Sequence, residues 1–267
     1  MGSPTRVRVT KMHGAQNDFV LLDARAAALG DLSAFARRAC DRRSGIGADG
    51  LLVLETSQDG DVRMRTINAD GSEAEMCGNG VRCAARWLDE AGAGQRMAFE
   101  TEAGTIHTEI VARAPEYHVR VAMGIPRIAA FNVREFPDAS FVDLGNPHVV
   151  VFCDDPAAVD LEALAEGLQR DPRLSEGANV HVFAVETSGG LRVRHWERGV
   201  GLTMACGTGA VACAAVAIAQ RRVVSPVSVD VPGGHLSVEW DGRGDAFLSG
   251  PAIRVFDTEV EFDAHGD

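Results

Sequence analysis

Positive charge is scarce in this sequence. The chain of 267 residues carries 26 basic and 38 acidic side chains, so its formal net charge is −12, and Lys11 is its only lysine. Nucleic acids and anionic membranes are bound through basic surfaces, and the composition therefore argues against both as partners. An acidic small molecule stays open as a ligand, because such a ligand needs only a few local donors.

Long apolar segments are also missing. The longest apolar run covers residues 210–219, which is too short for a helix that crosses a bilayer, since such a helix needs about 20 residues. Residues 1–6 contain no apolar core of a signal peptide. We therefore expect a soluble protein of the cytoplasm.

The cysteines lack the usual spacing of redox and zinc sites. There are six of them, but no Cys-x-x-Cys pair and no zinc-finger pattern occurs. In a reducing compartment, most unpaired cysteines are small core residues. We expect this of Cys40, Cys83, Cys153 and Cys213. The remaining two cysteines stand in a special sequence context.

What the chain does contain is an internal repeat at a fixed spacing. Met76-Cys77-Gly78-Asn79-Gly80 resembles Ala205-Cys206-Gly207-Thr208-Gly209, and the two stretches lie 129 residues apart. The same spacing carries Asn17 onto Asn146. Weak matches that share one register indicate two homologous halves of one fold.

The spacing of 129 residues predicts that the two halves align over a long stretch. It carries Gly104 onto Gly233, and no gap is needed from Asn17 through Gly104. We expect the halves to be joined near Gly124-Ile125-Pro126. The alignment therefore predicts that each element of the first half has a counterpart in the second.

Each half repeats the same order of predicted elements. Short apolar runs predict buried strands, alternating patterns predict half-buried strands, and helical spacing predicts outer helices. The predicted strands cover residues 19–23, 51–55 and 61–68 in the first half and 148–152, 180–186, 190–197, 228–231 and 235–240 in the second. The outer helices cover residues 32–40 and 160–170.

A further helix is predicted over residues 209–221, directly after the second cysteine stretch. It is apolar on almost every side. A helix without a polar face is buried rather than placed on a surface. We therefore expect a sheet to wrap around it.

The Cys-Gly-x-Gly stretches predict a chemical role for Cys77 and Cys206. Each stands where the chain enters a helix, and glycines there let the backbone turn tightly. The first turn of a helix offers N–H donors and partial positive charge to an anion. The same environment favours the thiolate form of a cysteine. Each half therefore combines an anion-binding turn with a sulfur that can act as a base.

Two such sulfurs are suited to inverting an amino acid at Cα. One base removes the proton from one face, and an acid on the other face returns a proton. Donors around the carboxylate stabilise the carbanion that forms between these steps. The repeat thus indicates a racemase or an epimerase. Two other classes stay open, which are a dithiol redox or zinc protein and a non-catalytic amino-acid binder.

Six motifs together resemble the diaminopimelate epimerase family, whose members work without pyridoxal phosphate. They cover nearly the whole chain and are Lys11-Met12-His13-Gly14-Ala15-Gln16-Asn17-Asp18-Phe19, Asn68-Ala69-Asp70-Gly71-Ser72, Met76-Cys77-Gly78-Asn79-Gly80-Val81-Arg82-Cys83, Gly145-Asn146-Pro147-His148, Trp196-Glu197-Arg198-Gly199 and Ala205-Cys206-Gly207-Thr208-Gly209. The related proline racemases carry His where this chain has Asn79. A racemase of proline or hydroxyproline type is the second enzyme hypothesis.

The resemblance implies an α+β fold of two pseudo-symmetric halves. Each half is a curled mixed sheet around a central helix. We expect the halves to be residues 1–124, joined by a C-terminal strand over 252–267, and residues 125–251, with the active site in the cleft between them. The resemblance also implies a homodimer, no cofactor and no metal.

The resemblance further implies a role for each motif residue. Cys77 and Cys206 are the acid and the base of the epimerisation of LL- and meso-diaminopimelate, in the synthesis of lysine and of the cell-wall precursor. Around them, Gly78, Asn79, Gly207 and Thr208 hold the reacting carboxylate, and Asn68, Glu197 and the Arg198 backbone surround the reacting ammonium. The distal amino-acid end is held by Asn17, Asn146, Asn179 and the Arg198 side chain, and His148 and Glu197 tune the two thiols.

Three other positions are predicted to contribute less. Some family members have glutamine at the position of Gly50, where this chain offers only backbone, so Gly50 is a weaker candidate for the distal site than Asn179. His181 and His195 show no sign of a partner in the sequence.

Overall fold

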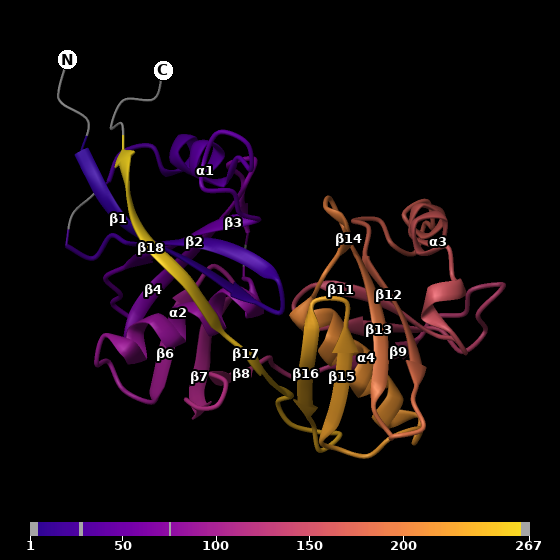
Figure 1. Cartoon of the computed structure of the whole chain (residues 1–267). Helices are drawn as coiled ribbons and strands as arrows, with labels where there is room; N and C mark the ends of the chain where they lie inside the picture. The colour runs from indigo at the N-terminus through magenta and orange to yellow at the C-terminus, as the bar shows by residue number, and fades with distance from the viewer. Residues whose placement is uncertain (1–4, 27–28, 75, 263–267) are drawn as a thin grey trace. The chain divides into compact units, whose positions relative to one another are not determined.

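The computed structural model describes residues 5–26, 29–74 and 76–262. It divides into two compact units, of which unit 1 comprises Met1–Val121 and Pro251–Asp267 and unit 2 comprises Ala122–Gly250. Figure 1 labels the elements of both units. Within the described ranges, no helix combines the length and the apolar character that a membrane span requires.

The sheet of unit 1 is mixed and includes both the first and the last strand that the structure describes. The C-terminal strand β18 pairs with the N-terminal strand β1 (Figure 1), and only the pairs β2–β3 and β4–β6 are parallel among the main strands. In sheet order, the strands are β18 (Ile253–Phe262), β1 (Thr5–Gly14), β2 (Asn17–Asp23), β3 (Gly50–Glu55), β4 (Val62–Asn68), β6 (Arg96–Thr101), β7 (Gly104–Ala112) and β8 (His118–Ala122), with the short β5 (Glu73–Ala74) on β4.

The sheet of unit 2 has the same order of parallel and antiparallel pairs. Its parallel pairs are β11–β12 and β13–β15, and β9 pairs with β10 as β18 does with β1. In sheet order, the strands are β9 (Arg127–Ala130), β10 (Ser140–Asp143), β11 (Pro147–Phe152), β12 (Asn179–Val185), β13 (Leu191–Glu197), β15 (Val227–Val231), β16 (Gly234–Glu239) and β17 (Phe247–Pro251), with the short β14 (Gly201–Thr203) on β13.

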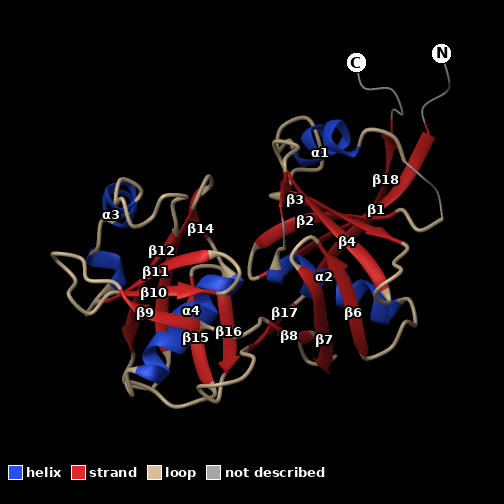
Figure 2. Ribbon diagram, turned by 180° about the vertical axis from the view of Figure 1, so that it is seen from behind, coloured by secondary structure: helices blue, strands red, loops and turns tan. Residues whose placement is uncertain are grey.

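Each sheet curls around one central helix. In unit 1, α2 (Gly78–Glu90) contacts strands from β18 to β7, and in unit 2, α4 (Gly207–Ala219) contacts strands from β10 to β16. Figure 2 shows α4 among the strands of its unit. Almost every side chain of α4 is buried, which confirms the prediction that this apolar helix lies inside a sheet. The α+β fold class is confirmed as well.

A second helix of each unit covers the outer face of the sheet. These helices are α1 (Leu32–Cys40) and α3 (Leu161–Leu168), and Asp31 and Asp160 cap their N-termini by accepting from the third backbone N–H. Their apolar sides form cores with the inner strands β2 and β3 or β11 and β12. A short 3₁₀ helix, η1 (Pro156–Ala158), precedes α3. All predicted strands and helices are therefore present, with ends that differ by a few residues.

The spacing of 129 residues does not hold as far as predicted. The central helices α2 and α4 keep it at both ends. The next hairpins, however, return at Gly104 and Gly234, which both have a positive φ, of 104° and 145°. Gly234 rather than Gly233 therefore corresponds to Gly104. The prediction of a gapless register was wrong by one residue, which is inserted between the central helix and the following strand of unit 2.

Candidate active site

Cys77 and Cys206 occupy equivalent places at the start of the two central helices. They are the N-cap residues of α2 and α4, with extended backbones (φ −133°, ψ 109° and φ −118°, ψ 114°). Neither cysteine side chain caps its helix. Each sulfur therefore lies beside a helix start whose N–H groups and dipole attract an anion.

In unit 1, two predicted site residues, Asn17 and Asn79, lie close to Cys77. The Cys77 thiol donates to Asn17 Oδ1 at 3.6 Å, and Asn79 Nδ2 donates to the same oxygen at 3.0 Å. Asn17 Nδ2 in turn donates to Asp49 Oδ2 at 2.8 Å. Asn17 comes from the first residue of β2 and Asn79 from the first turn of α2. The predicted distal residue Asn17 thus lies close to the cysteine sulfur of its own unit.

Arg82 is a further residue of this cluster, to which the sequence analysis assigned no role. Its side chain is fully buried, and it donates to Asn79 Oδ1 at 2.9 Å, to Pro251 O at 3.2 Å and to Gly78 O at 3.4 Å. None of these acceptors is a carboxylate, and burial lowers the pKa of Arg82 below its ordinary value. The sequence did contain a signal, since the equivalent residue of α4 is the apolar Val211.

Asn68 and Gly50 are paired residues on neighbouring strands of unit 1. Gly50 on β3 faces Asn68 on β4 in the antiparallel register. The Asn68 side chain donates to Ser72 Oγ at 2.9 Å. A Cβ at Gly50 would lie 3.0 Å from the Ile67 carbonyl oxygen, so a side chain there would crowd the neighbouring strand.

In unit 2, Cys206 lies beside Thr208 and Glu197. The distance from Cys206 Sγ to Thr208 Oγ1 is 3.6 Å, and Thr203 Oγ1 donates to Glu197 Oε1 at 2.5 Å. Cys206 is buried, with 4% of its surface exposed. Burial raises the pKa of the Cys206 thiol well above its ordinary value, and the nearby Glu197 carboxylate raises that pKa further. The equivalent of Glu197 in unit 1 is the neutral Asn68.

The remaining predicted residues of unit 2 gather where β11 and β12 begin. His148 and Asn179 are neighbours in the parallel register of these strands. Asn179 Oδ1 accepts from the Arg198 backbone N–H at 3.0 Å, and its Nδ2 donates to Pro147 O at 3.3 Å. The Arg198 side chain donates to the Glu176 carbonyl oxygen. Three segments that are far apart in sequence, around residues 148, 179 and 198, are thereby held in one cluster.

His148 bonds to other side chains than the cysteines. Its Nε2 lies 2.8 Å from Asn146 Oδ1, and its Nδ1 lies 2.9 Å from His181 Nε2. His181 Nδ1 lies 3.0 Å from His195 Nδ1. Burial lowers the pKa of His148 to about 3. The histidines for which the sequence showed no partner, His181 and His195, therefore belong to a buried chain that the sequence analysis missed.

The four cysteines that we expected to be core residues are free thiols. Three of them, Cys40, Cys83 and Cys213, are buried, and burial raises the pKa of each thiol, to about 11 for Cys40 and about 12 for Cys83. Cys153 donates to Phe183 O at 3.6 Å. These environments are typical of structural cysteines.

The sequence contains one stretch with the spacing of a dinucleotide-binding loop, from Gly45 to Gly50. It leads from helix α1 into strand β3. A dinucleotide-binding loop follows a strand and opens a helix, so the order of elements here is the reverse. Within the described ranges, no group of three or more His, Cys, Asp or Glu side chains is arranged to hold a metal ion.

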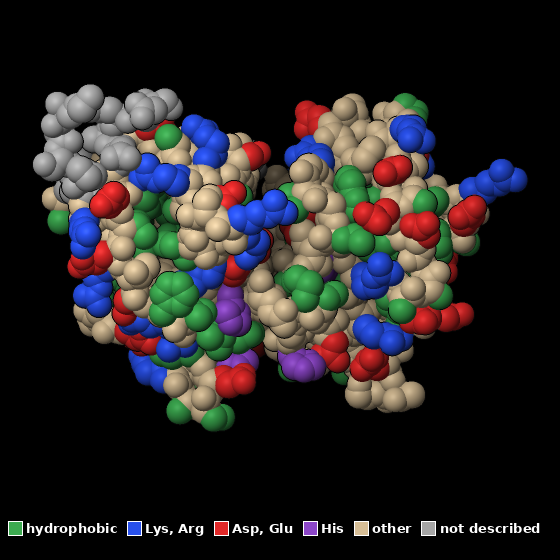
Figure 3. Space-filling view, turned by 45° about the horizontal axis from the view of Figure 1, so that its top comes forward, with side chains coloured by type: hydrophobic (Ala, Val, Ile, Leu, Met, Phe, Trp, Pro, Cys, Tyr) green, Lys and Arg blue, Asp and Glu red, His purple; other side chains and the backbone are tan. Residues whose placement is uncertain are grey.

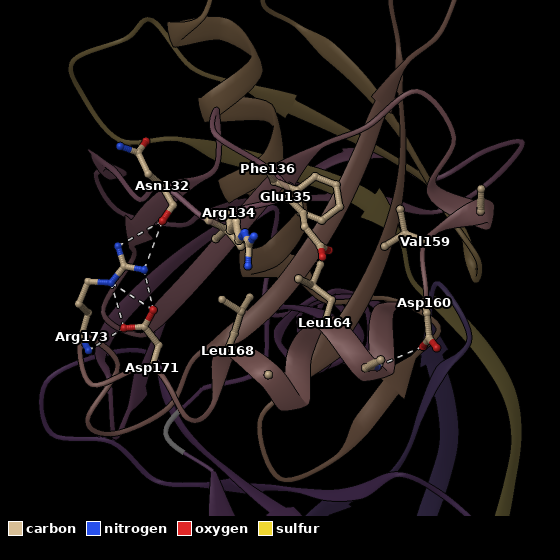
Figure 4. A pocket seen from close by; sticks show the side chains of 14 residues that line it. Asn132, Arg134, Glu135, Phe136, Val159, Asp160, Leu164, Leu168, Asp171 and Arg173 are labelled. Atoms are coloured by element: carbon tan, nitrogen blue, oxygen red, sulfur yellow. Dashed lines mark hydrogen bonds and ion pairs between the residues drawn. The ribbon is translucent and has the colours of Figure 1, made fainter.

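A surface pocket of unit 2 lies apart from these residues. It has a volume of about 630 Å³ and is formed by the segment 132–136 and helix α3 (Figure 4). Phe136, Leu164 and Leu168 line it, and at its rim Arg173 pairs with Asp171 at 2.5 Å. None of the predicted site residues lines this pocket. We therefore do not assign the active site to it, although it is large.

Charges of both signs are interspersed on the face of the molecule that Figure 3 shows. Among the described residues, charged side chains form surface ion pairs such as Arg96 with Glu109 at 2.8 Å and Arg63 with Glu102 at 2.8 Å. Exposed pairs of this kind contribute little to stability.

Solved structures share this fold. A phenazine biosynthesis protein of the PhzF family from Bacillus anthracis superimposes with a TM-score of 0.77 at 16% identity, over 96% of this chain and 99% of that chain. A probable proline racemase from Agrobacterium radiobacter gives a TM-score of 0.69 at 15% identity, over 96% and 93%. The fold class is thus that of a group which includes amino-acid racemases.

Sequence comparison defines the family within this group. The profile of the diaminopimelate epimerase family matches residues 9–129 and 140–255. The diaminopimelate epimerase of Sphingopyxis alaskensis is 41% identical over 97% of this chain and 99% of its own length, and that of Desulforudis audaxviator is 44% identical over 93% and 97%. The chain belongs to the diaminopimelate epimerase family.

Proposed function

We propose that this chain interconverts LL- and meso-diaminopimelate through the two sulfurs of Cys77 and Cys206, without a cofactor. The observation that carries the proposal is the placement of both cysteines as N-caps of equivalent helices in a member of this family. Each sulfur then adjoins an anion-binding helix start. Two such sites suit one α-carboxylate with a base on either face of its Cα.

The reaction moves one proton on and one proton off the same carbon. A thiolate on one face takes the proton from Cα, and the electron pair left on Cα spreads into the adjacent carboxylate. The helix N-termini stabilise the negative charge that develops there. A thiol on the opposite face then donates its proton to Cα. After one turnover, the two sulfurs have exchanged their protonation states, and no net proton is consumed.

The other predicted residues bind and orient the substrate in this proposal. In this proposal, Cys77 and Cys206 each contact one face of the substrate's Cα. The α-carboxylate is held at the helix starts by Gly78, Asn79, Gly207 and Thr208, the reacting ammonium by Asn68, Glu197 and the Arg198 backbone, and the distal amino-acid end by Asn17, Asn146, Asn179 and the Arg198 side chain. His148 and Glu197 tune the thiols.

The setting of the reaction follows from the same family. We infer a homodimer that works in the cytoplasm and supplies meso-diaminopimelate to lysine and cell-wall synthesis. Its net charge of −12 supports the inference that neither nucleic acid nor an anionic membrane is a partner. Proline and its hydroxylated form lack a second zwitterionic end, so Arg198 and the three asparagines of the distal site favour diaminopimelate over them.

The test is hydrogen exchange at Cα in deuterated water. Wild-type protein should convert LL-diaminopimelate to the meso form and introduce deuterium at the inverted carbon. Cys77→Ala and Cys206→Ala should each abolish interconversion in both directions. Any residual exchange should be confined to one stereoisomer for each variant and should differ between the two variants.

The chain supplies matched controls for this experiment. Cys83→Ala and Cys213→Ala remove a buried thiol from the same helices, α2 and α4, and should keep epimerisation. Circular dichroism establishes that all four variants are folded. A folded Cys77→Ala or Cys206→Ala protein that epimerises at a rate near that of the wild type would refute the two-base mechanism.

A further inference from the structure

Three histidines form one hydrogen-bonded chain inside unit 2. His148, His181 and His195 lie on the neighbouring strands β11, β12 and β13, and their side chains are buried, with at most 1% of the surface of each exposed. His148 Nδ1 lies 2.9 Å from His181 Nε2, and His181 Nδ1 lies 3.0 Å from His195 Nδ1. This chain of histidines, called the histidine chain below, ends at Asn146, whose Oδ1 lies 2.8 Å from His148 Nε2.

The fold does not require polar residues at these positions. In unit 1, the spacing of 129 residues places Phe19, Leu52 and Thr66 at the equivalent sites of β2, β3 and β4. The strand registers of the two units agree there. Burying a polar ring costs free energy unless its nitrogens are hydrogen-bonded. Unit 2 therefore has three hydrogen-bonded histidines in its interior, where unit 1 has mainly apolar packing.

The hydrogen bonds define the tautomer of each ring. Asn146 Oδ1 is an acceptor, so His148 carries its proton on Nε2 and accepts at Nδ1. His181 then donates from Nε2 and accepts at Nδ1, and His195 donates from Nδ1. Burial lowers the pKa of all three rings, which are thus neutral at pH 7.

The far end of the chain supports this direction of donation. His195 Nε2 has no hydrogen-bond partner within the described residues. In the stated direction, this atom is an unpaired acceptor. In the opposite direction it would be an unpaired buried N–H donor, and Asn146 would have to present Nδ2 to His148. Buried N–H groups without a partner are the rarer case in proteins.

The histidine chain also packs against the first turn of helix α4. A Cβ at Gly209 would lie 2.5 Å from His181 Cε1, so the ring packs directly on the helix backbone. Gly209 follows closely on Cys206 and on the Gly207-Thr208 turn. The three histidines thereby fix Asn146 relative to the helix start that carries the reacting sulfur of unit 2.

We propose that His195, His181 and His148 are positioning residues that hold the Asn146 carboxamide with Oδ1 toward the chain and Nδ2 toward the ligand. The Asn146 side chain, which is half-buried, makes no other hydrogen bond within the described residues. Nδ2 is therefore available as a donor, and it selects a carboxylate over an ammonium. This assignment rests on the proposed function, in which Asn146 binds the distal end of diaminopimelate.

The direct test is nitrogen NMR of wild-type protein labelled with ¹⁵N-histidine, because the two neutral tautomers and the charged ring have distinct nitrogen shifts. At pH 7, the proton should lie on Nε2 of His148, on Nε2 of His181 and on Nδ1 of His195. The exposed His107 and His235 provide reference signals. A charged ring in the chain, or the reversed set of tautomers, would overturn the proposal.

The functional test substitutes the residue that unit 1 carries. His181→Leu removes the middle of the chain and frees the Asn146 carboxamide to rotate. The loss of one positioning hydrogen bond should raise KM for diaminopimelate about 3- to 10-fold, while kcat changes little. His235→Gln, outside the chain, is the matched control. A folded His181→Leu protein with wild-type KM would contradict the assignment.

A second variant distinguishes an effect on the position of Asn146 from an effect on folding. His195→Thr cuts the chain at its far end and should shift the His181 and His148 tautomer signals and raise KM less than His181→Leu does. If His181→Leu does not fold, the wild-type tautomers still decide the question. If wild-type protein fails to epimerise diaminopimelate, the proposed function falls, whereas the tautomers test the chain by themselves.

Discussion

Arg82 donates a hydrogen bond to Asn79 at 2.9 Å and so places a fully buried guanidinium behind the first turn of α2. Asn79 in turn donates a hydrogen bond to Asn17 Oδ1, and the same oxygen accepts from the Cys77 thiol. In α4, the position of Arg82 is taken by Val211. The two helix starts thus share their backbone geometry but differ in charge, and unit 1 has a permanent cation close to its sulfur.

Replacing Arg82 by Met should destabilise the protein. Methionine fills much of the volume, but Asn79 Oδ1 and the Pro251 carbonyl oxygen lose the guanidinium as a donor, and each buried unsatisfied acceptor costs about 1–3 kcal/mol. The free energy of unfolding, measured with urea, should fall by at least this amount, and kcat/KM should fall because Asn79 is no longer held. Arg86→Met is the control, because Arg86 lies one turn further along α2 and pairs with Glu90 at 2.8 Å near the surface. Equal losses in the two variants would contradict a special role of Arg82.

Replacing Arg198 by Leu should weaken substrate binding. The backbone hydrogen bond from Arg198 to Asn179 remains, but the guanidinium is lost. A charge-assisted hydrogen bond to a carboxylate is worth about 1.5–3 kcal/mol, which corresponds to a fall in kcat/KM of about 10- to 150-fold. Arg192→Leu, at an exposed position of the preceding strand β13, should have no such effect. Wild-type kcat/KM in Arg198→Leu would remove this residue from the distal site.

Replacing Glu197 by Gln should make Cys206 more acidic. The negative charge of Glu197 is one of the causes that raise the pKa of the Cys206 thiol, so its removal lowers that pKa. The thiolate should then appear at lower pH in a titration of the ultraviolet absorbance of Cys77→Ala protein. Subtracting the Cys77→Ala, Cys206→Ala double variant isolates the signal of Cys206. A midpoint that stays in place or rises would show that Glu197 does not act on this sulfur.

The histidine chain should make the protein sensitive to acid. The pKa of His148 and of His195 is lowered from 6.5 to about 3, so the folded state resists protonation that the unfolded state accepts. Their contribution to stability is complete above pH 6.5 and is lost as the pH falls toward 3. Each ring removes about 1.4 kcal/mol per pH unit in this window.

Urea unfolding at a series of pH values measures this loss. In His195→Thr, the slope of the free energy of unfolding against pH should decrease by about 1.4 kcal/mol per pH unit, the contribution of one proton, because one buried neutral ring is gone. An unchanged slope in folded His195→Thr protein would mean that His195 is already charged in the native state.

The sequence by itself determined the repeat, the order of the elements and the two cysteine turns. These features depend on local signals, namely apolar periodicity, glycine spacing and the change from strand to helix pattern, and such signals act within about ten residues. The matched motif at Cys77 and Cys206 also indicated a racemase or an epimerase, while a dithiol redox or zinc protein and an amino-acid binder stayed open on the motif alone. The inserted residue before Gly234 escaped this alignment, since nothing in the local pattern marks it.

Only the tertiary structure decided which side chains meet. Arg82 is buried because the curled sheet closes around α2, and Asn17 reaches Cys77 across 60 residues because β2 runs beside the helix start. The chain of His148, His181 and His195 exists because three strands pair in one register, and a shift by a single residue would turn the rings to the opposite face of the sheet. Contacts of this kind depend on the pairing of distant segments, and no stretch of sequence carries that information locally.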